Sequence, residues 1–191
     1  MRRLKWSVLI LFSCAIVVAC SKAAIPASPP KLSARMSFVC KWWSEEQMNG
    51  LDPNNPPPQN TEVVIQKWDF SDPVGTPHPD VVELVVEVKN ESNAPISAVS
   101  VEIEGQWKTG PFWQEKLAKW MAPTKLKSIE ISSLPGHGSE SVRFPINVAA
   151  KSAELKNSKG WPYSFRGKAT ILVSGSTLAS TEAELPILKA D

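Results

Sequence analysis

The sequence is poor in the residue types that most often carry catalysis and metal binding. Its 191 residues include two histidines, three cysteines and one tyrosine. The Gly-x-Ser-x-Gly elbow of many serine hydrolases and the Cys-x-x-Cys-His motif of haem attachment are both absent. Isolated histidines and scattered cysteines make a poor zinc site. We therefore expect no metal, no other cofactor and no enzymatic activity.

The remaining candidates for chemistry are a few loop residues. A hydrolase would have to use His137 and Ser139, but two residues of one turn seldom place an imidazole on a neighbouring hydroxyl. His78 lies between prolines in another loop. Four aspartates lie in proline-rich loops with a spacing that matches no calcium loop, and we interpret them as solvated acids. They are Asp52, Asp69, Asp72 and Asp80.

The chain also lacks an apolar run long enough to span a membrane. Residues 6–19 are apolar apart from two serines, and they follow Arg2, Arg3 and Lys5. A membrane span needs about 20 apolar residues, whereas a basic segment before a shorter apolar one is typical of a secretion signal. We therefore predict a signal peptide at residues 1–19.

The end of this segment, Val17-Val18-Ala19-Cys20, resembles a bacterial lipobox. The resemblance implies a lipoprotein that is cleaved before Cys20 and acylated on its sulfur and on its new amino group, which anchors the chain to a membrane. Ser21 is not the aspartate that retains lipoproteins at the inner membrane of enterobacteria, so the resemblance favours the periplasmic face of the outer membrane. The alternatives are an ordinary secretory signal and a simple membrane anchor.

A lipid at Cys20 makes residues 20–33 a tether. Pro26, Pro29 and Pro30 favour an extended chain, which at about 3.1 Å per residue reaches roughly 40 Å. We expect a single folded domain at residues 34–191.

Neither sign of charge dominates the chain. It has 21 basic and 19 acidic residues, and three of the basic ones lie in residues 1–19, so the processed chain carries 18 against 19, a net charge of −1. No basic cluster stands out. We therefore expect no nucleic-acid partner.

Cysteine is too scarce for an intrachain disulfide in the processed chain. Cys14 leaves with the signal and Cys20 carries lipid, so Cys40 stands alone. It is either a small buried apolar residue or an unpaired thiol that awaits a partner chain in an oxidising compartment.

What the sequence does contain is apolar residues with a period of two. Val82–Val88 and Val99–Ile103 alternate most clearly with polar residues, which is typical of antiparallel strands with one buried face. Seven or eight such short strands predict an all-β sandwich. We expect helical insertions at 111–122 and 149–157. Further strands are expected at residues 36–42, 62–70, 126–134, 139–148, 163–174 and 178–188.

Residues 81–105, "VVELVVEVKNESNAPISAVSVEIEG", resemble immunoglobulin-like extracytoplasmic domains of the FxLYD and CARDB kinds. A strand ends at Asn90, a polar turn follows, and Pro95-Ile96 opens the next strand. Residues 133–148, "SLPGHGSESVRFPINV", resemble the Leu-Pro-Gly turn and following strand of the same domains. The resemblance implies an immunoglobulin-like antiparallel β-sandwich that serves as a binding or structural module, and it identifies no site.

Tryptophan is abundant, with eight residues in the chain. Trp113, Leu117, Trp120 and Met121 have the spacing of one apolar stripe on a short helix. This stripe either caps an open end of the sandwich or contacts another molecule, because tryptophan often dominates binding energy at interfaces. As the hypothesis to test, we expect a partner-binding surface made of Trp107, Phe112, Trp113, Leu117, Trp120 and Met121.

The sequence as a whole favours a membrane-anchored envelope lipoprotein that acts as a non-catalytic accessory or scaffolding module and binds protein. The alternative is a module that binds cell-wall glycan through stacked tryptophans.

Overall fold

The structure is a computed structural model and describes residues 30–188 except 53, 70–76 and 157. The predicted signal peptide, Cys20 and most of the predicted tether lie outside the described residues, as does Asp72. Among the described residues, no helix combines the length and the apolarity required to cross a bilayer.

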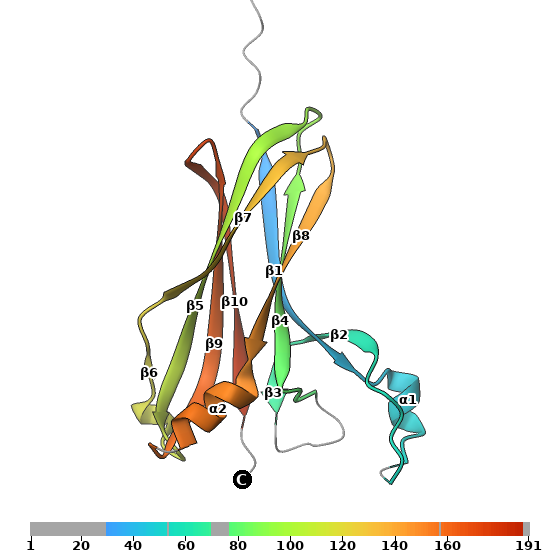
Figure 1. The fold of residues 1–191 in the computed structure, drawn as a ribbon, viewed down its shortest axis with the longest axis vertical. Coiled ribbons are helices and arrows are strands. Elements are labelled where there is room, and N and C mark those ends of the chain that lie inside the picture. The colour runs from blue at the N-terminus through green and yellow to red at the C-terminus, as the bar shows by residue number, and fades with distance from the viewer. Residues whose placement is uncertain (1–29, 53, 70–76, 157, 189–191) are drawn as a thin grey trace, which may run out of the picture.

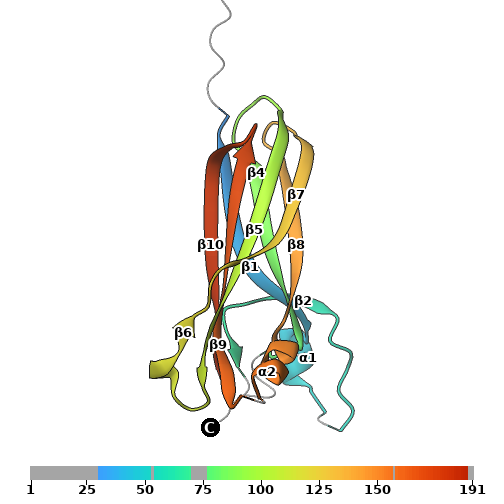
Figure 2. The ribbon, with the colours of Figure 1, turned by 60° about the vertical axis from the view of Figure 1, so that its left-hand side comes forward.

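The described chain folds into two β-sheets that lie along the long axis of the molecule (Figures 1 and 2). The first sheet contains, in spatial order, β2 (Thr61–Ile65), β1 (Leu32–Trp42), β4 (Val81–Asn90) and β8 (Ser139–Asn147). The second contains β3 (Trp68–Asp69), β10 (Ser176–Leu188), β9 (Gly160–Val173), β5 (Ile96–Pro111) and β6 (Lys119–Trp120), and β7 (Thr124–Leu134) also pairs with β5. The pairs are antiparallel, except that β3 runs parallel to β10.

The strand order is that of an immunoglobulin-like sandwich. The chain passes from β4 in the first sheet to β5 in the second, returns from β7 to β8, and crosses again from β8 to β9. The resulting strand orders are β1-β4-β8 in the first sheet and β7-β5-β9-β10 in the second. They match the immunoglobulin topology in which the strand that precedes the return to the first sheet, here β7, pairs with β5 in the second sheet. The predicted all-β immunoglobulin-like sandwich is therefore confirmed.

The core lies between the sheets and follows the predicted alternation. Every second residue of β4 from Val82 to Val88, and of β5 from Val99 to Ile103, has no exposed surface. These residues belong to one hydrophobic cluster that draws on both sheets. Full burial of each such side chain contributes about 1.5–3 kcal/mol, so these two strands contribute a large share of the stability of the fold.

Two expected boundaries are wrong. Leu32 and Ser33, assigned to the tether, already belong to β1, where Leu32 is buried. The strand expected at residues 62–70 is divided between β2 and β3, which lie in different sheets, and Phe70 lies outside the described residues. Both short strands place an apolar residue in the core, Ile65 in β2 and Trp68 in β3, and the Gln66-Lys67 segment between them contains no glycine or proline that would mark the bend.

One of the two expected helical insertions is present. The helix expected at 149–157 is confirmed as α2 (Val148–Lys156). The helix expected at 111–122 is wrong, because β5 continues to Pro111 and a single 3₁₀ turn, η1 (Glu115–Leu117), precedes β6. The chain at Trp113 adopts a left-handed conformation with φ 66°, which interrupts any helix.

A helix that we did not expect is α1 (Glu45–Asn49). The Ser44 hydroxyl accepts the N–H of Gln47 at 3.2 Å, and the Gln47 side chain accepts the N–H of Ser44 at 2.9 Å. This reciprocal capping box satisfies two backbone donors at the start of the helix. The Ser-x-x-Gln spacing was therefore a usable signal in the sequence.

Asn90, at the end of β4, is a fully buried polar residue. Its side-chain Nδ2 donates to the carbonyl oxygens of Ala94 (2.8 Å), Leu134 (3.1 Å) and Pro135 (3.0 Å), and its Oδ1 accepts the N–H of Ser92 at 2.9 Å. One amide thus joins the loop between β4 and β5 to the turn between β7 and β8.

We expect Asn90→Ala to lower the free energy of unfolding by about 2 kcal/mol, because buried carbonyl groups lose their donor. Urea unfolding at neutral pH measures this change. The control is Ser97→Ala, which truncates an exposed polar side chain near the start of β5 and which we expect to change the free energy by less than about 0.5 kcal/mol. Equal effects of the two substitutions would contradict the role given to Asn90.

Cys40 in β1 is buried, with 4% of its surface exposed. Burial raises the pKa of its thiol to about 11, so the reactive thiolate is scarce at neutral pH. Of the two interpretations left open by the sequence, this environment favours the small buried residue.

We therefore expect Cys40 to resist aromatic disulfide reagents at pH 8 and to react at least about 100-fold faster in urea, as the thiolate form and the access both increase. The measurement uses residues 20–191 produced without the signal peptide and with Cys20→Ser, in which Cys40 is the remaining thiol. Rapid stoichiometric labelling of the folded protein would instead favour an accessible thiol.

Candidate binding site

A pocket of about 700 Å³ lies at the end of the sandwich where β5 ends and β9 begins. Its walls come from the connection after β5, from α2 and from the first residues of β9. Figures 1 and 2 place α2 and β6 at this end, far from the start of β1. We call it the α2 pocket, and its principal lining residues are Phe112, Trp113, Ser152, Lys156, Lys159 and Trp161.

Three aromatic rings form the apolar part of the α2 pocket. The ring centroids of Phe112 and Trp113 lie 4.5 Å apart at an interplanar angle of 77°, and those of Phe112 and Trp161 lie 5.5 Å apart at 71°. Such edge-to-face contacts stabilise aromatic pairs. Phe112 and Trp113 remain 37% and 52% exposed, so this aromatic wall is open to solvent.

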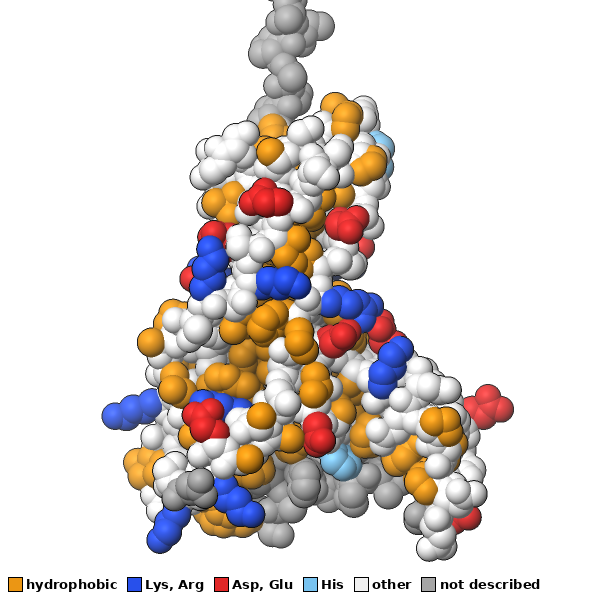
Figure 3. All heavy atoms as spheres, viewed as in Figure 1, with side chains coloured by type: hydrophobic (Ala, Val, Ile, Leu, Met, Phe, Trp, Pro, Cys, Tyr) orange, Lys and Arg blue, Asp and Glu red, His pale blue; other side chains and the backbone are white. Residues whose placement is uncertain are grey.

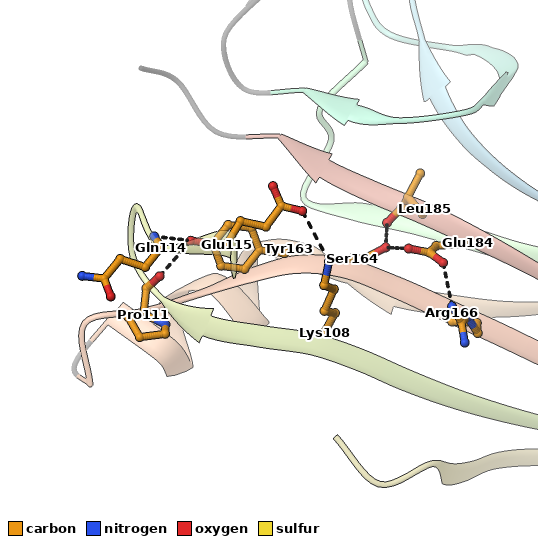
Figure 4. Close-up of polar contacts among 9 residues, drawn as sticks. All are labelled: Lys108, Pro111, Gln114, Glu115, Tyr163, Ser164, Arg166, Glu184 and Leu185. Carbon is orange, nitrogen blue, oxygen red and sulfur yellow. Dashed lines mark hydrogen bonds and ion pairs between the residues drawn. The ribbon is translucent and has the colours of Figure 1, made fainter. Parts of the chain in front are cut away.

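The only tyrosine of the chain fixes the turn that carries two of these rings. The Tyr163 hydroxyl donates to the carbonyl of Pro111 at 2.8 Å and accepts the N–H of Gln114 at 3.0 Å (Figure 4). The N–H of Phe112 donates to the carbonyl of Lys159 at 2.8 Å. In a helix, the backbone N–H and C=O groups of this turn would pair with one another. Here they are instead hydrogen-bonded to Tyr163 of β9 and to Lys159, which precedes β9.

A glycine allows this turn to close. A Cβ on Gly110 would lie 2.6 Å from the Cα of Ala118, a backbone atom that has little room to move. The two sides of the turn approach this closely because β6 pairs with β5 at Lys108 and Thr109.

The α2 pocket is apolar in its walls and basic at its edge. Lys156 and Lys159 are its exposed charged residues, and no acidic residue lines it within the described chain. Two enclosed polar atoms of its lining residues, Ser152 Oγ and Trp161 Nε1, have no hydrogen-bond partner among the described residues. Each such group carries a desolvation cost of about 1–3 kcal/mol.

The six expected partner-binding residues do not form one surface. Only Phe112 and Trp113 line the α2 pocket. Trp107 packs on Phe165 with ring centroids 4.8 Å apart and is partly buried against the core. Leu117 and Met121 are exposed on either side of β6, outside that pocket.

Trp107 also lines a second, shallower hollow of about 300 Å³, together with Leu126, Phe144 and residues of α2. Hydrophobic side chains gather along the middle of the face shown in Figure 3. The hollow lies between the second sheet and β8, where the sandwich is open at its edge.

Trp120 belongs to a polar row on the outer face of the second sheet. The Arg166 guanidinium lies 4.2 Å from the centroid of the Trp120 ring and donates to Glu184 at 2.9 Å, while Ser164 donates to the same carboxylate at 2.6 Å (Figure 4). Burial raises the pKa of Glu184, but the hydrogen bonds from Ser164 and Arg166 outweigh it, so this pKa lies below its ordinary value. The row holds β9 and β10 together.

The sequence reasoning missed Trp161, Lys156 and Lys159. Trp161 lies two residues before the expected strand at 163–174, and the lysines lie at or just beyond the end of α2. The signal was weak, because only the pairing of Pro111 with Gly160 brings these segments beside Phe112.

The residues weighed for catalysis and metal binding are dispersed. His137 Nε2 lies at hydrogen-bond distance, 2.7 Å, from the acceptor oxygen Oδ1 of Asn93, while the His78 ring packs on Trp42 with centroids 5.1 Å apart. Asp69 pairs with Lys67 at 2.7 Å. Within the residues that the structure describes, no group of three or more histidine, cysteine or acidic side chains could hold a metal ion.

No family model and no curated protein matches this chain. Among solved structures, the CARDB domain of a Pyrococcus furiosus protein, in complex with di-metal ions, is 12% identical, with a TM-score of 0.39 over 84% of this chain and 96% of that chain. Red sea bream transglutaminase is 14% identical, with a TM-score of 0.39 over 66% of this chain and 16% of that one. The sporulation control protein Spo0M from Bacillus subtilis is 7% identical, with a TM-score of 0.35 over 84% and 49%. Likenesses of this size carry no functional inference.

Proposed function

We propose that this protein is a lipid-anchored module of a bacterial cell envelope that binds another protein without catalysis, as an accessory or scaffolding subunit. The observation that carries the proposal is the α2 pocket, an open aromatic cavity at the end of the sandwich opposite the start of β1.

The anchor is proposed from the lipobox-like Val17-Val18-Ala19-Cys20. Several acyl chains on Cys20 would hold the chain durably, since each buried CH₂ contributes about 0.8 kcal/mol. The chain enters the sandwich at Leu32, the first residue of β1, so a lipid at Cys20 would attach to the end of the sandwich opposite the α2 pocket. The absence of aspartate at position 21 favours the periplasmic face of the outer membrane.

A protein partner fits the α2 pocket better than a glycan does. A glycan would stack on coplanar rings along a groove, whereas the rings here meet at 71° and 77°. A cavity of about 700 Å³ can enclose a side chain of a partner protein, and tryptophan is frequent at the centres of protein interfaces.

We expect Trp113→Ala to reduce partner capture at least about tenfold, because it removes the most exposed ring of the pocket. The unfolding free energy should change by less than about 1 kcal/mol, since half of this side chain is already in solvent. The measurement is photo-crosslinking in native envelopes from a benzophenone residue at position 112, with and without Trp113→Ala.

The matched control is Leu178→Ala, an exposed apolar residue of β10 near the opposite end of the sandwich. It should leave capture unchanged. A loss of several kcal/mol in Trp113→Ala, or equal capture by both variants, would contradict a docking role for the pocket.

For the anchor, we expect Cys20→Ala to abolish incorporation of radiolabelled palmitate and to release the chain from the membrane fraction, or leave it unprocessed. Fractionation of labelled cells and intact-mass analysis measure both effects. A Cys20→Ala variant that is still cleaved and still membrane-bound would sink the lipoprotein part of the proposal and leave the docking part standing.

A further inference from the structure

We infer that the α2 pocket binds the C-terminal residue of a partner polypeptide, with an apolar side chain among the rings and the terminal carboxylate at Lys156 and Lys159. This inference rests on the proposed docking function and adds the chemistry of the bound group.

The charge at the α2 pocket is uncompensated. Two other lysines at this end of the sandwich have acidic partners: Lys151, also in α2, lies 2.8 Å from Glu154, and Lys108 of β5 lies 3.3 Å from Glu115. Lys156 and Lys159 have no such partner among the described residues, although both border the cavity. A bound anion would supply the partner that the described chain does not.

The dipole of α2 accounts for a lysine at position 156 but not for one at position 159. Lys156 lies in the last turn of α2, where a cation is favoured by the helix dipole. Lys159 lies beyond the helix in a left-handed conformation with φ 54°. Its N–H donates to the carbonyl of Lys156 at 3.0 Å and its carbonyl accepts the N–H of Phe112 at 2.8 Å, so its backbone is fixed at the pocket edge.

The interior of the pocket lacks hydrogen-bond partners. Trp161 Nε1 can only donate, and Ser152 Oγ can donate or accept; neither has a partner among the described residues. Both atoms are enclosed in the structure, so an acceptor in the pocket pairs with them once the side chain of Ser152 or Trp161 turns toward the cavity. A carboxylate suits both the lysines and these polar atoms. It only accepts hydrogen bonds, and its hydrogen bonds to cations are stronger than those between neutral groups.

A chain terminus provides the apolar group and the charge on one residue. Its side chain and its carboxylate share a Cα, so both can enter a single cavity of about 700 Å³. An internal acidic side chain would instead place its own charge where the aromatic wall requires an apolar group.

The test uses the mature lipidated protein in detergent and three dye-labelled glycine–serine peptides that end in phenylalanine. The first has a free C-terminal carboxylate, the second is amidated, and the third is amidated with one internal glutamate. Fluorescence anisotropy should give at least about tenfold tighter binding of the free acid than of either amidated peptide.

The double variant Lys156→Met with Lys159→Met should lower the affinity of the free acid to that of the amide. Trp161→Phe keeps an aromatic ring but removes the indole N–H donor. It should reduce the ratio between the affinities for the free acid and for the amide. Lys116→Met removes an exposed lysine of η1 that does not line the pocket, and it should keep the tenfold preference.

Equal binding of acid and amide, or a preference that survives the double lysine variant, would overturn the inference. Equal affinity for the free acid and for the internal glutamate peptide would mean that the pocket recognises an acidic segment and not a chain terminus. This result would also overturn the inference. None of these results bears on the docking function, which is decided separately by whether Trp113→Ala reduces the crosslink in native envelopes.

Discussion

The approach of two chain crossovers at one end of the sandwich is the constraint on which the fold depends. The chain changes sheets between β4 and β5 and again between β7 and β8, and the side chain of Asn90 donates to carbonyls of both connections. The connections come so close that a Cβ on Gly136 would lie 2.1 Å from the carbonyl oxygen of Asn93. Because backbone polar groups enclosed there need partners, one buried amide lets the apolar faces of β4 and β5 meet.

The opposite end is organised by different means and is left open. There β5 and β9 continue past the main core to the pairing of Pro111 with Gly160, and the Tyr163 hydroxyl fixes the turn that follows. This extension presents Phe112 and Trp113 beside α2 without burying them. The two ends therefore differ. At one end a buried amide has its hydrogen bonds satisfied, and at the other a cavity keeps exposed apolar surface and polar atoms that have no partner within the described part of the chain.

The sequence predicts the sandwich well because alternation reports directly on which face of a strand is buried. It predicts the α2 pocket poorly, because the pocket is made by segments that only the β5–β9 register brings together. Trp113, Leu117, Trp120 and Met121 have helical spacing by coincidence: β-pairing and the Tyr163 hydrogen bonds determine the local conformation. Phe112 and Trp113 were identified through the abundance of tryptophan, whereas Trp161 has no local pattern that marks it.

The proposed tether and the pocket are physically complementary. A pocket that encloses one residue of a partner offers few contacts, so its intrinsic affinity is limited by the entropy lost on association. A chain held at a membrane by roughly 40 Å of extended tether samples a thin layer, which raises its effective concentration toward partners at the same membrane. A tether that joins at β1 and a pocket that opens at the far end would let weak, specific recognition suffice, without the broad apolar interface that a free protein of equal affinity would need to expose.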